Sequence, residues 1–127
     1  MADTPEEAVA LHVRAIGDTR EIKMVDTIHL PFQHYSAGAE WVFQWNVPAD
    51  VPEYMEMLDP KWAGTSCKLK DLQVVCASDR KVAYRVLATR FRADGTRMQD
   101  FEAIYSVLKK DEDWRVVNRN PINVFPA

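Results

Sequence analysis

The sequence contains few glycines, few cysteines and no long apolar run. Its four glycines stand alone along 127 residues, so a glycine-rich phosphate loop is absent. No apolar run approaches the ~20 residues of a membrane span. The formal charge of −3 is opposite in sign to the dense basic surface that binds phosphate backbones. We therefore expect a protein that contacts neither membranes nor nucleic acids.

The two cysteines and the N-terminal segment allow a prediction of the cellular compartment of the protein. Cys67 and Cys76 lie nine residues apart on one predicted strand, so they cannot approach disulfide distance without a fold in that strand. They form no Cys-x-x-Cys motif either. Residues 1–7 are acidic and lack the basic and apolar regions of a secretory signal. Reduced cysteines without such a signal predict a cytoplasmic protein.

The histidines have no metal-ligand pattern. No His-x-x-x-His or similar spacing occurs, and no Gly-x-Ser-x-Gly nucleophile elbow is present. The histidines are His12, His29 and His34. We expect neither a metal nor a cofactor.

Helical signals concentrate in the first half of the chain. A cap at Thr4 and a capping box with Glu7 predict a helix that ends at Gly17. Apolar residues that recur every three positions predict a shorter second helix within residues 18–31, which Pro31 would end. A capping pattern at Asp50 predicts a third helix within residues 50–60.

Strand signals dominate the rest. Strands 32–36 and 40–45 form a predicted hairpin around Gly38. A bulge near Lys70–Asp71 would keep both neighbouring leucines on one face. The later strands are predicted at 65–78, 81–93, 96–109 and 114–124, with turns at Asp94-Gly95 and 111–113. The order of elements predicts a single α+β domain over residues 1–127.

The late strands carry apolar residues on both faces. In one strand Val86 and Ala88 alternate with Leu87 and Phe91. A sheet covered on one side alone would show one polar face. In a chain this short, a second copy is the expected cover, so we predict a homodimer through the sheet.

Three closing segments carry a resemblance to a known family. They are Phe91-Arg92-Ala93-Asp94-Gly95-Thr96, Tyr105-Ser106-Val107-Leu108-Lys109 and Asp113-Trp114-Arg115-Val116. With the order of elements, they resemble the nuclear-transport-factor-2-like superfamily, and the stretch from Leu30 to Gly38 is similar to a bacterial branch of unassigned function. The resemblance implies a curved, cone-like antiparallel sheet wrapped around the N-terminal helices and enclosing a pocket. The superfamily includes ketosteroid isomerases, polyketide cyclases, dehydratases, epoxide hydrolases and noncatalytic modules, so the fold does not settle the function.

The resemblance does not bring the ketosteroid isomerase residues with it. Those enzymes have a tyrosine in the first helix, and the matching position here is His12. They have an aspartate base shortly before the hairpin glycine, where this chain has Tyr35. Tyrosine has a reference pKa of ~10 and is a poor base near neutral pH. We therefore do not expect that isomerase activity.

Three residues are candidates for proton transfer. His34 has a reference pKa of ~6.5, which suits acid–base work at neutral pH. Tyr105 and Glu102 are predicted on one late strand. Each has a structural alternative: a hydrogen-bonded strand histidine, a core tyrosine, and a carboxylate in a cross-strand ion pair with Arg85.

Other residues are candidates for ligand contact. Trp41 and Trp45 share a predicted strand face with Phe43, which suits a flat ligand, a core or a dimer contact equally. Asn118 lies among apolar residues of the last strand. The predicted ligand contacts are His12, Tyr35, Trp41, Trp45 and Asn118.

The leading hypothesis is a pocket that binds a small apolar or cyclic molecule. If it is an enzyme, the reaction would be proton transfer in an isomerisation, dehydration or hydration. The alternative is a noncatalytic module that binds a ligand or a protein, including a structural accessory to another enzyme. The sequence leaves the choice open.

Overall fold

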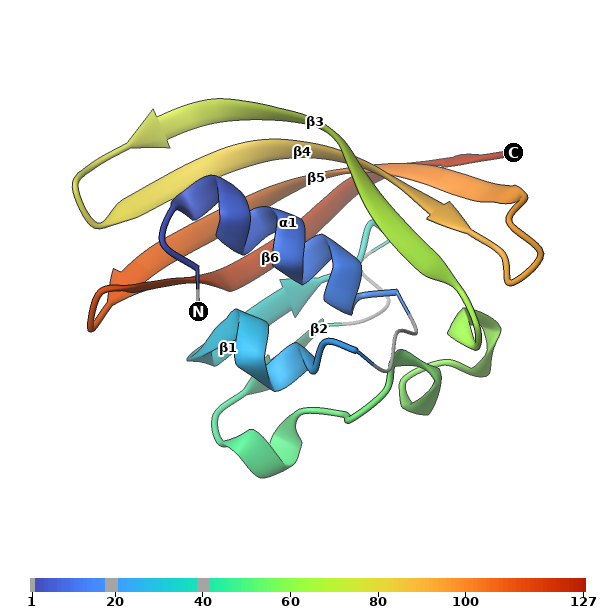
Figure 1. The fold of residues 1–127 in the computed structure, drawn as a ribbon, viewed down its shortest axis with the longest axis horizontal. Helices are drawn as coiled ribbons and strands as arrows, with labels where there is room; N and C mark the ends of the chain where they lie inside the picture. The colour runs from blue at the N-terminus through green and yellow to red at the C-terminus, as the bar shows by residue number, and fades with distance from the viewer. Residues whose placement is uncertain (1, 18–20, 39–41) are drawn as a thin grey trace.

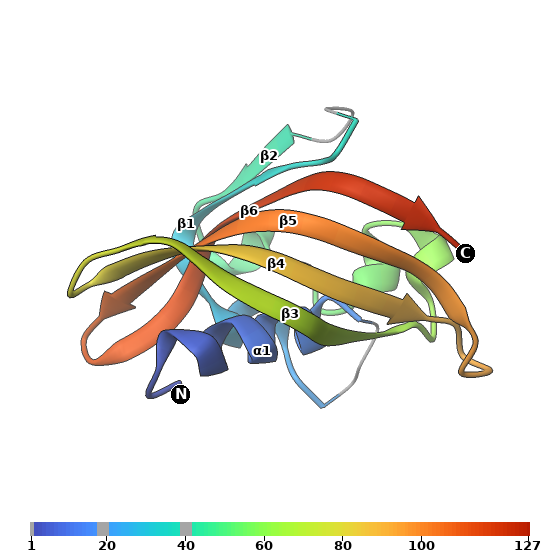
Figure 2. The same ribbon diagram turned by 90° about the horizontal axis from the view of Figure 1, so that it is seen from above.

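A computed structural model describes residues 2–17, 21–38 and 42–127. These residues form one α-helix and a six-stranded sheet. The helix is α1 (Pro5–Ala15), and the strands are β1 (Ile28–Tyr35), β2 (Val42–Trp45), β3 (Ser66–Ala77), β4 (Lys81–Phe91), β5 (Arg97–Lys110) and β6 (Asp113–Pro126). The strand order is β2-β1-β6-β5-β4-β3 (Figure 2). The β1–β6 pair is parallel and the other pairs are antiparallel.

The sheet curves around α1, as Figure 1 shows. The predicted α+β class and the curved sheet around the N-terminal helix are confirmed, although the parallel pair makes the sheet mixed. The Thr4 hydroxyl accepts the Glu7 N–H at 3.2 Å, which fixes the predicted start of α1. A Cβ on Gly17 would lie 2.9 Å from the Cys67 nitrogen, so glycine lets the end of the helix approach β3 closely.

The two other predicted helices are wrong. Residues 24–27 form a single 3-10 turn, and the chain then enters β1, with Pro31 inside the strand. The apolar residues recurred every three positions, which is the period of a 3-10 helix. Pairing with β6 then satisfies the extended backbone. The proposed caps at positions 18 and 19 lie outside the described residues.

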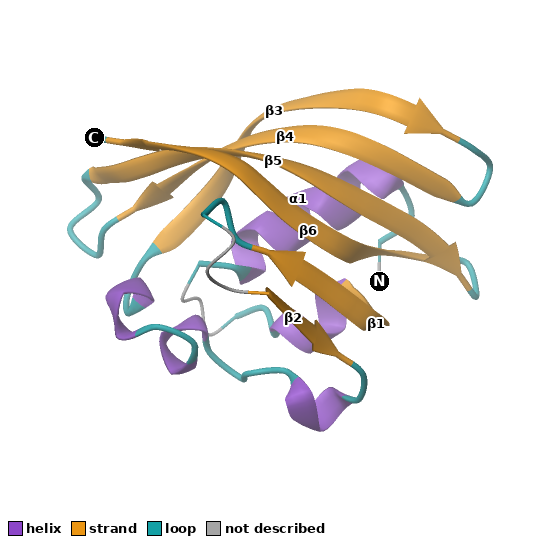
Figure 3. Ribbon diagram, turned by 180° about the vertical axis from the view of Figure 1, so that it is seen from behind, coloured by secondary structure: helices purple, strands orange, loops and turns teal. Residues whose placement is uncertain are grey.

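Short turns replace the predicted third helix. The segment contains 3-10 turns at Pro48–Asp50, Met55–Met57 and Pro60–Trp62. Proline at positions 52 and 60 leaves too few residues between them for a stable α-helix. The turns Met55–Met57 and Pro60–Trp62 lie next to each other below the sheet, and Pro48–Asp50 lies apart from them, nearer the end of β2 (Figure 3).

The predicted late strands and turns are confirmed, as is the bulge near Lys70. The register shifts between Leu69 and Asp71 at that point. Gly95 has a φ of +87° in the turn after β4. The predicted hairpin strands appear as β1 and β2, while residues 39–41 lie outside the described part.

A bulge in β6 that the sequence did not reveal decides which side chains face inward. Val116 pairs with Val107, but Asn118 pairs with the adjacent Ser106, so one extra residue is inserted between them. Side-chain parity therefore reverses, and Arg119 lies opposite Tyr105 on the inner face.

The inner face of the sheet and α1 form the core. Val9, Val13, Val86 and Val107 are fully buried there. The Tyr84 hydroxyl donates to Glu6 at 2.9 Å and links β4 to the first turn of α1.

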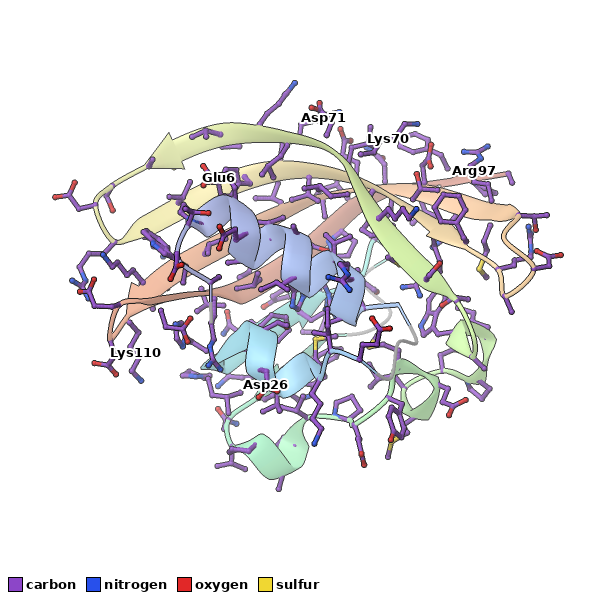
Figure 4. All side chains as sticks on the ribbon, in the orientation of Figure 1. Glu6, Asp26, Lys70, Asp71, Arg97 and Lys110 are labelled. Atoms are coloured by element: carbon purple, nitrogen blue, oxygen red, sulfur yellow. The ribbon has the colours of Figure 1, made fainter. Side chains whose placement is uncertain are left out.

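Figure 4 labels Glu6 beside the sheet, and it shows Lys70 and Asp71 on the side of β3 away from α1.

The structure also bears on the cysteines and on the question of a membrane-spanning helix. Cys67 is buried and Cys76 is exposed, and both are free thiols, so the two do not form a disulfide, as predicted. No helix in the described ranges is long and apolar enough to cross a membrane.

Candidate functional site

An open pocket of about 400 Å³ lies beyond the C-terminal end of α1. Strands β1, β2, β4, β5 and β6 contribute lining residues, and so do the turns Met55–Met57 and Pro60–Trp62. The polar lining includes His34, Arg90, Gln99, Tyr105 and Arg119. The aromatic and apolar lining includes Ile16, Phe43, Met55, Leu58, Trp62, Phe101, Pro121 and Val124.

A buried guanidinium is the central polar group. Arg119 is only 4% exposed. Its Nε–H donates to His34 Nδ1 at 3.1 Å, and Nη1 lies 2.8 Å from His12 Nε2. Its remaining polar neighbour is the Met24 sulfur, 4.0 Å from Nη1. Within the described residues, no carboxylate pairs with Arg119.

The hydrogen-bond network assigns the tautomers of both histidines. Because Arg119 can only donate, His12 Nε2 and His34 Nδ1 are acceptors without protons. His12 Nδ1–H then donates to the Thr27 hydroxyl at 2.9 Å, and that hydroxyl donates to the Met24 carbonyl at 2.9 Å. The neutral His34 ring carries its proton on Nε2, where it serves as a donor.

Burial and the arginine charge keep the two histidines neutral. Desolvation, followed by the charge of Arg119, lowers the pKa of His34 to about 3. The same two causes hold the pKa of the fully buried His12 well below its usual range. Burial also lowers the pKa of Arg119 to about 10, so the guanidinium remains charged at neutral pH.

Tyr105 adds a second buried donor. It pairs with Arg119 across β5 and β6, and its ring makes an edge contact with His12 at a centroid distance of 5.6 Å. Its hydroxyl is buried and has no hydrogen-bond partner within the described ranges. Burial raises the pKa of Tyr105, so the hydroxyl keeps its proton.

Further charges lie toward the short turns. Arg90 is 4% exposed, donates to the Thr65 hydroxyl at 2.7 Å and lies 4.0 Å above the Trp62 ring. Asp59 and Lys61 also line the pocket and face each other at 3.6 Å. Asp59 and Lys61 offset each other, so they do not balance the charge of Arg119.

Aromatic rings form the wall beside His34. Phe43 stacks on His34 at a centroid distance of 4.8 Å and on Trp45 at 4.7 Å. Phe32 continues the stack against Trp45 at 5.3 Å. Phe43 is the ring of this stack that lines the pocket next to the polar cluster, and the rings of Phe32 and Trp45 lie buried behind it.

The structure brings together part of the predicted site. His34 and Tyr105 line the pocket, while His12 lies one layer behind them and supports Arg119. Trp45 is buried in the aromatic stack rather than among the lining residues. Trp41 lies outside the described residues.

Three other predicted residues are placed away from the pocket. Glu102 faces outward, where it accepts hydrogen bonds from Arg85 at 2.6 Å and Asn123 at 2.8 Å. Tyr35 is 46% exposed because it has the opposite parity from His34. Asn118 pairs with Ser106 on the outer side of the bulge. The ion-pair interpretation of Glu102 therefore matches the structure.

Sequence reasoning missed both pocket arginines. Arg90 has the same strand parity as Val86 and Ala88, so the alternation contained the signal. Arg119 had no such signal, because the bulge after Val116 reverses the parity of β6. In the described ranges, no cluster of three His, Cys, Asp or Glu side chains is arranged to hold a metal.

Comparisons with known proteins support the fold. Residues 63–121 match a family described as NTF2-like protein (DUF6841). No curated protein sequence matches the chain. A protein of unknown function with a cystatin-like fold from Nostoc punctiforme superposes with a TM-score of 0.65 and 12% identity, covering 96% of this chain and 89% of that one.

Two similar structures carry proposed activities of their own. A proposed ketosteroid isomerase from Shewanella frigidimarina has a TM-score of 0.65 at 13% identity, over 92% of this chain and 93% of that one. A proposed aromatic ring hydroxylase from Novosphingobium aromaticivorans has a TM-score of 0.59 at 11% identity, over 96% and 90%. At these identities the likeness shows the fold alone.

Proposed function

We propose that the chain, which has an NTF2-like fold and matches an NTF2-like family over residues 63–121, binds a small, largely apolar cyclic molecule in the pocket beyond α1. One observation carries the proposal: buried polar groups of His34, Tyr105 and Arg119 meet an aromatic wall at an opening of about 400 Å³. Apolar pockets of roughly 300–1,000 Å³ with a few convergent polar groups are typical ligand sites. The fold neighbours, which include a proposed isomerase and a proposed hydroxylase, agree with this use.

The polar groups suit donation to a ligand oxygen. His34 is a weak base because its pKa is lowered to about 3, and its Nε2–H is a donor. Tyr105 offers a hydroxyl proton, and Arg119 offers a fixed positive charge. Such donors stabilise negative charge that develops on a carbonyl oxygen during proton transfer. Asp59 is the one carboxylate among the described lining residues and is the candidate proton acceptor.

A thermal-shift screen tests the binding proposal. Small cyclic and aromatic compounds would be tested against the wild type, Leu58→Trp and Val74→Trp. Leu58 lines the pocket, whereas Val74 is 60% exposed on β3 away from it. A ligand at 100 times its dissociation constant stabilises a fold by about 2.7 kcal/mol.

We expect compounds that stabilise the wild type and Val74→Trp but not Leu58→Trp, because the added indole occupies the pocket. A screen without hits on folded protein, or hits that stabilise Leu58→Trp equally, would contradict the proposal. The first result would favour the alternative of a protein-interaction module.

We also propose that a second copy covers the outer face of the sheet. Leu87 and Ile104 are half-buried there, next to the Arg85–Glu102 ion pair. Light scattering should then give a dimer for the wild type and a monomer for Ile104→Asp. A wild-type monomer at micromolar concentration would refute this proposal.

A further inference from the structure

The pocket holds a buried positive charge that the described protein does not neutralise. Arg119 is 4% exposed, and its hydrogen-bond partners are two imidazoles held neutral by the network. A buried charge without an opposite charge is costly, and proteins normally pair it. The outer-face cations Arg85 and Arg97, by contrast, each contact a carboxylate. An anion bound in the pocket would therefore compensate the charge of Arg119.

The hydrogen-bond donors of the pocket also indicate a ligand with acceptor oxygens. A guanidinium has five N–H donors. Within the described ranges, Nε of Arg119 donates to His34 and Nη1 contacts His12 and Met24, while no residue accepts from Nη2. The buried hydroxyl of Tyr105, on the paired position of β5, has no partner either. A ligand with acceptor oxygens would satisfy both groups.

We infer that the pocket selects cyclic or aromatic molecules that carry a carboxylate, with Arg119 as its anion receptor and Tyr105 and His34 as supporting donors. This inference rests on the proposed function. A carboxylate is acceptor-only and accepts parallel hydrogen bonds from a guanidinium. The Arg119 guanidinium contacts only neutral groups, so a single carboxylate at this position would balance its charge.

The apolar wall defines the rest of the molecule. Phe43 and Phe101 line the pocket beside His34 and Tyr105, and Trp62 lies under Arg90. An aromatic acid would place its ring on this wall and its carboxylate at Arg119.

Paired probes test the inference directly. Isothermal titration calorimetry would compare 2-naphthoate, the matched neutral 2-naphthamide and 2-naphthyl phosphate at neutral pH. The proteins would be the wild type, Tyr105→Phe, Arg119→Met and Leu58→Trp, each checked for folding by circular dichroism. Tyr105→Phe keeps the ring and removes only the unpaired hydroxyl, so it tests the site even if Arg119→Met fails to fold.

The wild type should bind 2-naphthoate at least about tenfold more tightly than 2-naphthamide. Tyr105→Phe should weaken naphthoate binding by about tenfold and weaken naphthamide binding less, because the amide carbonyl accepts a weaker hydrogen bond than the carboxylate. Leu58→Trp should bind neither compound.

Other outcomes overturn the inference in distinguishable ways. If naphthamide binds as tightly as naphthoate, the anion receptor is refuted while the ligand-binding proposal stands. Tighter binding of naphthyl phosphate would refute the carboxylate assignment. If naphthoate binds Leu58→Trp as well as the wild type, it is held at the surface. Absence of binding by these probes and of hits in the wider screen would refute both proposals.

Discussion

The two faces of the sheet differ in whether their charged side chains are paired with an opposite charge. On the outer face, Asp100 accepts from the Thr89 hydroxyl at 2.6 Å and lies within 3.3 Å of both Lys70 and Arg97. On the inner face, Arg119 is buried against neutral rings. Outer charges are thus paired within the chain, whereas the inner charge is left for a partner that the described residues do not supply. This contrast is the basis for proposing that the ligand site lies on the inner face.

Removing one arginine from each face gives the largest expected difference. Arg119→Met should weaken binding of 2-naphthoate by about 100-fold, because truncating one side of a buried charge pair costs several kcal/mol. Arg85→Met on the outer face should leave binding unchanged. Calorimetry on the two folded variants measures both effects, and equal losses would erase the distinction between the faces.

The loss of folding stability at acidic pH should also differ between variants of the inner face and of the outer face. The folded-state pKa of His34 is about 3, below its unfolded value of ~6.5, so the unfolded chain binds the proton first. The stability of the wild type should therefore fall as pH drops from about 6.5 toward 3, with His34 contributing up to about 1.4 kcal/mol per pH unit. Urea unfolding at pH 7.5, 6 and 5 measures this slope. His34→Gln should have a shallower slope.

Glu102→Gln is the outer-face control for that experiment. Hydrogen bonds from Asn123 and Arg85 lower the pKa of Glu102, so its contribution is present above the unfolded value of ~4.3 and is lost as pH falls below it. Its slope between pH 7.5 and 5 should match that of the wild type. A His34→Gln curve parallel to the wild type would contradict the assignment of His34 as a buried neutral ring.

Two tyrosine variants should show the smallest effects, with opposite signs. Tyr105→Phe removes a buried hydroxyl without a described partner and should raise the free energy of unfolding by about 1 kcal/mol. Tyr84→Phe removes the hydrogen bond to Glu6 and should lower it by about 1 kcal/mol. Urea titration compares them. Destabilisation by Tyr105→Phe would mean that its hydroxyl is already satisfied.

Much of the fold could be predicted because its strands follow simple periods. Apolar alternation and the Asp94-Gly95 turn placed β3 to β6 within a few residues, and parity even required the bulge at Lys70. The helical half was harder, because a three-residue recurrence fits both a short helix and a 3-10 turn. Tertiary pairing of β1 with β6 decided that segment, and no local pattern reveals such pairing.

The site could be predicted only in part, for a related reason. Sequence reasoning reached His34 and Tyr105 through their side-chain chemistry, and both line the pocket. Arg119 follows a bulge that reverses parity, and the amino acids around it are unremarkable for a strand. Sequence reasoning instead selected its neighbour Asn118 for its amide among apolar residues, and Asn118 faces outward. The residue that defines the pocket's charge became visible only with the register.

The relative affinity of wild-type protein for 2-naphthoate and 2-naphthamide tests the central claim most directly. The two probes share a ring system and differ in charge at the group expected to meet Arg119. An unpaired buried guanidinium predicts that the carboxylate binds at least about tenfold more tightly. Equal affinities, or tighter binding of the amide, would show that the inner-face charge does not select the ligand.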